Sequence, residues 1–112
     1  MTQSSALRKE AAAPNPTPIT IDGNYVPNPK HAAIGNDGSL TFNCAKPTWL
    51  YTSPTGVFGD SQGIVKLVKG PNDPIYPQKP NVTVDYCSTA ANTTCSPKRR
   101  VEDGGNTIKV GN

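Results

Sequence analysis

The sequence predicts an all-β protein, an antiparallel Greek-key β-sandwich of about six or seven short strands with a flexible N-terminal tail. Three observations predict this class. Twelve prolines and ten glycines in 112 residues leave few windows long enough for a helix. Short alternations of apolar and polar residues recur between turn signals, as the strands of a sandwich require. No helical pattern longer than two turns follows residue 17.

Residues 1–17 are predicted to form a tail or tether, and residues 18–112 the sandwich domain. The segment SSALRKEAAA contains one large apolar side chain, Leu7, and an isolated helix this short is marginal in water. The PNPTP that follows favours extended, polyproline-like backbone. The tail is therefore expected to act as a stiff spacer.

Alternation predicts which side chains form the core. Ile19 and Ile21 share one face of ITID, and Leu40 and Phe42 share one face of SLTFN. The expected strands are 19–22, 26–34, 39–43, 48–52, 64–69, 81–87 and 106–110. The expected core comprises Phe42, Trp49, Tyr86 and the isoleucines and valines of these strands. Four prolines within residues 70–80 argue against regular structure there.

The charge pattern argues against nucleic acid as a partner. The formal charge is +3, and the one tight basic cluster, residues 98–100, is followed at once by Glu102 and Asp103. A nucleic-acid surface needs basic residues gathered on one face, so a solvated loop is the better interpretation. No apolar run reaches the roughly 18 residues of a membrane span, and no membrane insertion is expected.

The three cysteines are expected to serve stability. Cys87 and Cys95 lie eight positions apart after a strand-like run, and a disulfide between them would close a small loop. Cys44, at the end of another strand, is a competitor for either partner. Structural zinc takes four ligands with close cysteine pairs, and a redox pair takes C-x-x-C; both spacings are absent. No metal site is predicted.

The compartment is predicted to be extracytoplasmic: periplasmic, secreted or surface-attached. Three cysteines in a small domain with a lean core favour an oxidising environment. Two glycosylation sequons, Asn81-Val82-Thr83 and Asn92-Thr93-Thr94, fit an exported chain. The segment after Met1 lacks the apolar region of a signal peptide, which leaves either a mature exported form or a cytoplasmic protein.

Two pairs of segments resemble the cupredoxins, small copper proteins built as β-sandwiches. ITIDGNYVPNP followed by GNDGSLTFN resembles the family's opening strands. VDYCSTAANTTCSP followed by GGNTIKV resembles its penultimate strand, ligand loop and closing strand. The resemblance covers residues 19–111 and implies a cupredoxin-like sandwich.

The same resemblance implies a fold without its copper site. In the family, a cysteine in this loop is followed by a histidine three positions later and often by a methionine. Cys87 matches the cysteine, Ala90 occupies the histidine position, and Cys95 falls where the methionine could lie; no histidine follows Asn43. A blue-copper site needs two imidazoles and a thiolate. An immunoglobulin-like sandwich is the alternative, because alternation places Tyr86 in the core and Cys87 at the strand's end.

No enzyme and no cofactor are predicted. His31 is the single histidine, and a lone imidazole without a local nucleophile or acid motif is better interpreted as structural. The aspartates lie mostly in turns, where they bond to local backbone. The glycine pairs precede strands rather than helices, so they do not form a phosphate loop.

The predicted function is a non-enzymatic module that binds another protein, or assembles, through its loops. Phe58, Ile75 and Tyr76 lie in two long irregular segments, residues 53–63 and 70–80, and are candidate contacts if exposed. Trp49 and Tyr51 share one face of a strand, either in the core or as a flat binding face. The alternatives are a structural subunit of a virion, tail or filament, and a cupredoxin-type electron-transfer or metal-carrier protein.

Overall fold

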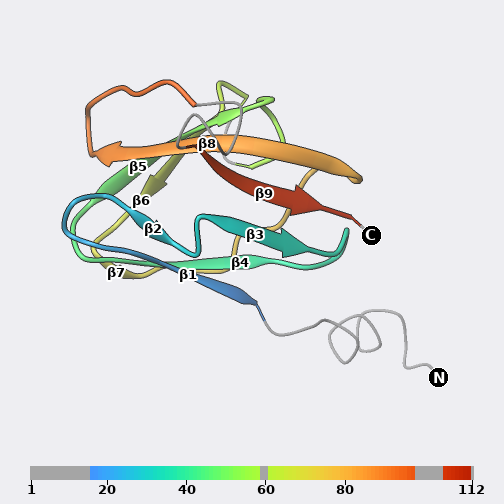
Figure 1. Ribbon diagram of the computed structural model, residues 1–112, viewed down its shortest axis with the longest axis horizontal. Coiled ribbons are helices and arrows are strands. Elements are labelled where there is room, and N and C mark those ends of the chain that lie inside the picture. The colour runs from blue at the N-terminus through green and yellow to red at the C-terminus, as the bar shows by residue number, and fades with distance from the viewer. Residues whose placement is uncertain (1–15, 59–60, 98–104, 112) are drawn as a thin grey trace.

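The computed structural model describes residues 16–58, 61–97 and 105–111. Within these residues the chain is all-β, with nine strands in two sheets and no helix (Figure 1). The strands are β1 (Thr17–Ile21), β2 (Pro27–Asn28), β3 (His31–Ile34), β4 (Leu40–Cys44), β5 (Thr48–Ser53), β6 (Ile64–Leu67), β7 (Gly70–Pro71), β8 (Val82–Ala90) and β9 (Asn106–Val110).

Both sheets are mixed, so the expected purely antiparallel arrangement is wrong. The four-stranded sheet has the order β2-β1-β4-β7 and the five-stranded sheet β3-β9-β8-β5-β6. The pairs β1·β4 and β3·β9 are parallel, and the other pairs are antiparallel. Parallel neighbours need a crossover connection. For the pair β1·β4, the chain makes this crossover by passing from β2 into β3 of the opposite sheet and then returning to β4.

The two shortest strands were not predicted as separate elements. Pro27 begins β2 and Pro71 ends β7, and each strand has two residues at an edge of the four-stranded sheet. Edge positions tolerate proline because the missing N–H faces away from the ladder. Segment 70–80, expected to be irregular, therefore contributes β7 and an isolated bridge between Leu40 and Ile75.

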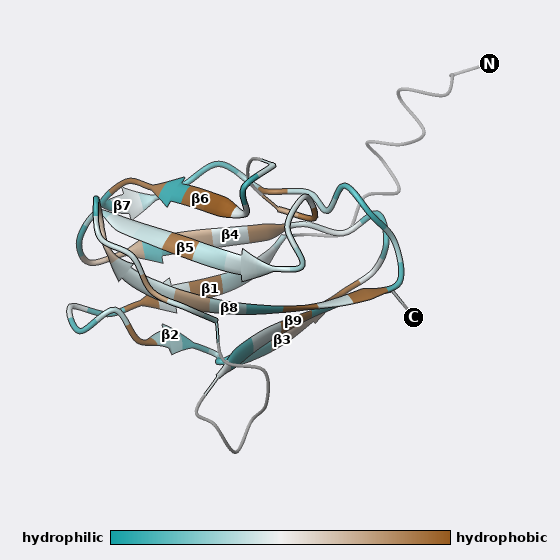
Figure 2. Ribbon diagram, turned by 90° about the horizontal axis from the view of Figure 1, so that it is seen from above, coloured by the Kyte–Doolittle hydropathy of each residue, from teal (hydrophilic) through white to brown (hydrophobic). Residues whose placement is uncertain are grey.

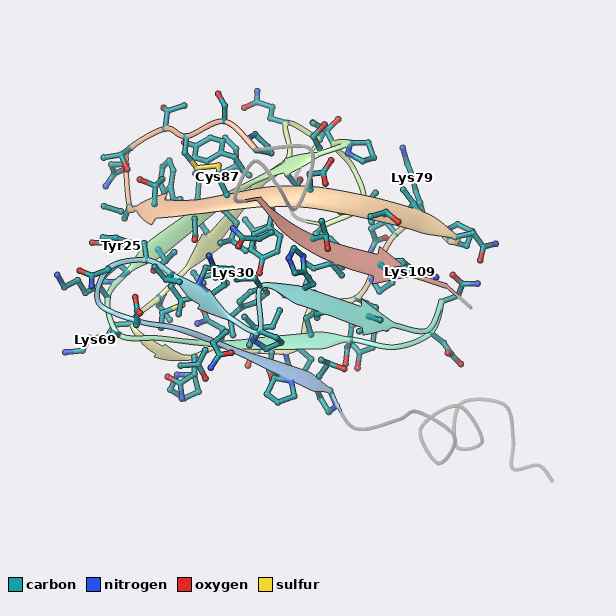
Figure 3. The ribbon with its side chains drawn as sticks, in the orientation of Figure 1. Tyr25, Lys30, Lys69, Lys79, Cys87 and Lys109 are labelled. Carbon is teal, nitrogen blue, oxygen red and sulfur yellow. A yellow bond between two sulfur atoms is a disulfide. The ribbon has the colours of Figure 1, made fainter. Side chains whose placement is uncertain are left out.

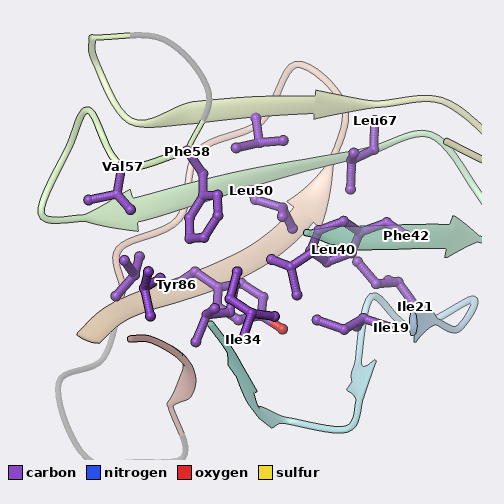
Figure 4. Packing of buried hydrophobic residues seen from close by; sticks show 14 of the residues in the cluster. Ile19, Ile21, Ile34, Leu40, Phe42, Leu50, Val57, Phe58, Leu67 and Tyr86 are labelled. Atoms are coloured by element: carbon purple, nitrogen blue, oxygen red, sulfur yellow. The ribbon is translucent and has the colours of Figure 1, made fainter. Parts of the chain in front are cut away.

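The core lies between the two sheets, on the faces that alternation predicted (Figure 4). Figure 2 shows the strands changing between hydrophobic and hydrophilic colours along their length. The buried apolar residues are Ile19, Ile21, Ile34, Leu40, Phe42, Cys44, Leu50, Val57, Phe58, Val65, Leu67, Val84, Tyr86, Ile108 and Val110. Each large apolar side chain contributes about 1.5–3 kcal/mol by burial, and together they hold the sheets face to face.

Three members of the predicted core lie outside it: Val26 and Val68 are 40% and 61% exposed, and Trp49 is half-buried. On β5 the inward positions are taken by Leu50 with Thr48 and Thr52, while Trp49 and Tyr51 are half-buried on the outer face. The two threonines can face inward because their hydroxyls donate to carbonyl oxygens, Thr48 to Lys46 at 2.7 Å and Thr52 to Gly63 at 3.0 Å. The prediction for Trp49 failed because both faces of TWLYT carry apolar groups.

The predicted boundary between tail and domain lies within two residues of the first strand. β1 begins at Thr17, the last residue assigned to the tail, and residues 1–15 lie outside the described part of the chain. The basic cluster at 98–100 also lies outside it. Among the described residues, no helix has the length and hydropathy to cross a membrane.

Candidate binding surfaces

A disulfide joins Cys87 to Cys95, with 6.2 Å between the two Cα atoms. Cys87 lies on the outer face of the five-stranded sheet, because its neighbour Tyr86 faces the core. The expected position at the strand's end is wrong, since β8 continues to Ala90. Figure 3 shows the sulfur–sulfur bond beside Cys87, above the sheet. The bond therefore ties a loop onto a strand that continues past it.

Residues 91–97, here called the pinned loop, fold back over β8 (Figure 1). The Tyr51 hydroxyl on β5 donates to the Thr93 carbonyl oxygen at 2.7 Å. The Thr93 hydroxyl donates to the Ala90 carbonyl oxygen at 2.5 Å and lies 2.8 Å from the Thr89 hydroxyl. Asn92 adopts a left-handed φ of 65° at the turn, which asparagine tolerates better than most residues. One covalent bond and several hydrogen bonds thus fix this polar loop.

Cys44 does not join either of the other cysteines. It is buried as a free thiol in β4, on the inner face of the other sheet. Burial raises the pKa of the Cys44 thiol, and a hydrogen bond with Thr48 opposes this shift. The competing pairings with Cys87 and Cys95 are therefore not formed. Among residues 16–58, 61–97 and 105–111, no group of three His, Cys, Asp or Glu side chains is placed to hold a metal.

His31 is exposed on the outer edge of β3, where its Nδ1 lies 2.9 Å from the Thr107 hydroxyl. The predicted interpretation of a structural, hydrogen-bonded histidine fits this contact. Asp22 likewise accepts backbone N–H bonds from Asn24 and Val26 at 2.8 and 3.0 Å. That is the local turn role expected of aspartate.

The three predicted loop contacts differ in exposure. Phe58 is 2% exposed and belongs to the core, so it is not a surface contact. Ile75 is half-buried, and it exchanges backbone hydrogen bonds of 2.8 and 2.9 Å with Leu40. Tyr76 is 51% exposed. Val57 and Phe58 both pack into the core, which leaves Tyr76 as the exposed member of the set.

Asn72 organises the proline-rich segment, a role that no pattern in the sequence indicates. Its Oδ1 accepts from the Val68 N–H at 3.0 Å. Its Nδ2 lies 3.0–3.2 Å from the carbonyl oxygens of Val68, Gly70 and Phe42. The amide thus links the chain after β6 to β4 of the opposite sheet. GPNDP reads as a turn in sequence, and only the folded chain brings Phe42 beside it.

A groove of about 380 Å³ runs between β6 and the segment that contains Asn72. β6 is an edge strand, and edge strands can pair with another chain. Here the edge is blunted in three ways: β6 has four residues, Lys66 is exposed within it, and Asn72 takes both the N–H and the C=O of Val68. The groove is therefore poorly suited to the addition of a strand.

A second pocket, of about 280 Å³, lies where β8 extends beyond the start of β9. It is called the Tyr86 pocket here. Its lining residues are Tyr25, Val26, Pro27, Lys30, Tyr86, Cys87, Ser88, Cys95, Ser96, Gly105 and Asn106. Figure 3 labels Tyr25, Lys30 and Cys87 around this region. The pocket is thus walled by the β1–β2 turn on one side and by β8 with the disulfide on the other.

Two buried polar atoms among these lining residues have no hydrogen-bond partner: the Tyr86 hydroxyl oxygen and Asn106 Oδ1. Tyr86 is 0% exposed and Asn106 8% exposed. Burial raises the pKa of the Tyr86 hydroxyl far above its usual range, so it stays protonated. The two residues face each other in the β8·β9 register. Alternation in the sequence predicted that Tyr86 lies in the core. It did not predict that Asn106 lies opposite Tyr86 on the neighbouring strand.

The sequence matches no protein-family model, and no curated protein proved significantly similar to it.

Proposed function

We propose that the protein is a non-enzymatic, extracytoplasmic β-sandwich module that binds another protein, or assembles, through its loops. The observation that carries the proposal is the pinned loop. The disulfide and the Tyr51 hydrogen bond hold it in place, while Asn92, Thr93 and Thr94 remain exposed. Recognition residues are commonly carried on loops of a rigid scaffold. A loop that is already ordered loses less entropy when a partner binds.

The disulfide supports the extracytoplasmic assignment, because such bonds persist mainly in oxidising compartments. The cupredoxin-like fold remains part of the proposal, and the two mixed sheets are compatible with it. Copper chemistry is not part of it, because the residues do not fit. The sulfur of Cys87 is bonded to Cys95 and cannot act as a thiolate ligand, and Ala90 offers no imidazole.

A structural subunit of a virion, tail or filament is the alternative role. The blunted edge of β6 argues against assembly by strand addition. Light scattering over a range of concentrations tests this alternative: a module that binds a different protein stays monomeric, and a subunit that assembles with itself grows in mass with concentration.

Site-specific photo-crosslinking in the native host tests the binding role. A photoreactive residue replaces Thr94 in the pinned loop, and a control replaces Asp37 in the exposed turn before β4. A discrete adduct from position 94, weaker or absent from position 37, is expected. Equal labelling from both positions, or none from 94, would contradict binding through this loop. Thiol trapping in the same cells should find Cys87 and Cys95 oxidised; finding them reduced would refute the compartment.

A further inference from the structure

We propose that the Tyr86 pocket binds a small molecule that carries both a carboxylate and hydroxyl groups, of the size of one acidic sugar ring. This goes beyond the proposed function, because it concerns a small ligand and a site under the pinned loop rather than the exposed loop surface. The proposal depends on the two unpartnered polar atoms, on the charge of the lining, and on the size of the pocket.

The unpartnered atoms indicate what a ligand would supply. Leaving a buried donor or acceptor unsatisfied is costly, and folded proteins contain few such groups. Asn106 Nδ2 donates to the Tyr86 carbonyl oxygen at 3.1 Å, which fixes the amide with Oδ1 as the free atom. Oδ1 accepts only, and the Tyr86 hydroxyl can donate or accept. A hydroxyl-bearing ligand can satisfy both atoms.

The charge of the lining favours an anion. Lys30 is the charged residue among those that line the pocket, and none of the described lining residues is acidic. Its side chain is exposed, so a carboxylate near it would form a pair of modest strength. Lys30 therefore selects the charge of the ligand more than it contributes affinity.

The remaining walls combine apolar surface with the hydroxyls of Tyr25, Ser88 and Ser96. Val26, Pro27 and the disulfide present apolar surface, and the Ser88 hydroxyl donates to the Tyr25 carbonyl oxygen at 2.5 Å. An apolar wall beside a few polar groups is the usual composition of a small-ligand site. The volume of about 280 Å³ lies just below the range typical of drug-sized ligands. The pocket suits a single ring rather than an oligosaccharide.

Both free atoms are closed to solvent, so the ligand reaches them only if side chains at the base of the pocket rotate. Hydrogen bonds gained there offset this rearrangement, since each one satisfies a buried polar atom that otherwise has no partner. Binding should therefore perturb the backbone amides around Asn106 and Ser88 as well as those at the rim.

The test is an NMR titration of the whole protein with D-glucuronate, with D-glucose and acetate as probes that lack the carboxylate or the hydroxyls. Saturable shifts at Ser88, Gly105 and Asn106 are expected with glucuronate and much weaker ones with either control. Lys30→Gln should weaken binding by up to about fivefold, whereas Lys109→Gln, an exposed lysine on β9, should not change it. Tyr86→Phe should weaken binding by up to about tenfold.

Tyr86→Phe also reports on the free protein. If its hydroxyl has no partner, the variant should be at least as stable as the wild type. No saturable shift with glucuronate, equal shifts with glucose or acetate, or equal weakening by Lys30→Gln and Lys109→Gln would each overturn the proposal. The two lysine variants decide the matter even if Tyr86→Phe fails to fold, because both positions are exposed.

Discussion

Two irregular segments are held against the sandwich by different means, the pinned loop of residues 91–97 and the segment around Asn72. A covalent bond and the Tyr51 hydroxyl fix the first to the outer face of one sheet. The Asn72 amide side chain, together with backbone hydrogen bonds from Asn72 to Phe42 and between Ile75 and Leu40, fixes the second between β6 and β4. A disulfide acts largely by restricting the unfolded chain, whereas the amide acts only in the folded state. The two devices should therefore fail under different conditions.

The largest effect is expected when the disulfide is removed. Replacing both Cys87 and Cys95 with serine should lower the free energy of unfolding by about 2–3 kcal/mol, because the unfolded chain regains the freedom of the closed loop. Urea denaturation measures this loss. Wild type treated with reductant should match the variant. A loss well below 1 kcal/mol would mean that the loop's hydrogen bonds, and not its covalent bond, hold it.

The next effect is expected at Asn72. Asn72→Ala removes the side-chain hydrogen bonds to Val68, Gly70 and Phe42 but keeps the backbone bond from residue 72 to Phe42. It should cost about 1–2 kcal/mol, since water can replace part of the lost bonds. Asn72→Asp keeps the acceptor for the Val68 N–H but loses the donor, so it should be nearly as destabilising. Asn24→Ala, in an exposed turn, is the control. Equal effects at positions 72 and 24 would refute the role given to Asn72.

A smaller effect is expected for Tyr51→Phe. It removes the 2.7 Å hydrogen bond to Thr93 and keeps the ring on the sheet, so stability should fall by only about 0.5–1 kcal/mol. The loop should nevertheless loosen, and the Cys87–Cys95 bond should be reduced faster by a small thiol. Tyr76→Phe, at an exposed tyrosine next to Ile75, which bridges to β4 of the other sheet, is the matched control. Unchanged reduction kinetics in Tyr51→Phe would show that the disulfide alone orders the loop.

The contrast between the two segments also explains what the sequence could predict. Three cysteines allow only three pairings, and a close pair after a strand is a strong signal, so the Cys87–Cys95 disulfide was predicted. Alternation likewise predicted the inward faces of Ile19 with Ile21 and of Leu40 with Phe42, because period two is a local property.

What failed depends on contacts between distant segments. The parallel pairs β1·β4 and β3·β9 arise from crossovers between sheets, which no local pattern encodes. Asn72 in GPNDP is indistinguishable from a turn residue until Phe42 lies beside it. The position of Trp49 outside the core was decided by whether Thr48 and Thr52 could satisfy their hydroxyls inside it. The Tyr86 pocket required the register of β8 on β9.

Cys44 can distinguish the segment around Asn72 from the pinned loop, because it lies opposite Gly70 in the β4·β7 pair. Burial raises the pKa of its thiol above the ordinary 9.0, so near pH 9 the unfolded chain loses a proton that the folded chain keeps. Stability should therefore be unaffected by this thiol below about pH 8 and should fall as the pH rises past 9. Urea midpoints from pH 7 to about pH 9.5 measure this, and Cys44→Ala should lack that part of the decline.

The same thiol should report which segment opens. At pH 8 it should react slowly with iodoacetamide in the wild type, because the thiolate is the reactive form. Asn72→Ala should speed the reaction by loosening β7, which pairs with β4 at Cys44, whereas Tyr51→Phe, which acts on the outer face of the other sheet, should leave it unchanged. Acceleration by both variants would mean that the two segments open together, and the distinction between a covalently held and an amide-held segment would fail.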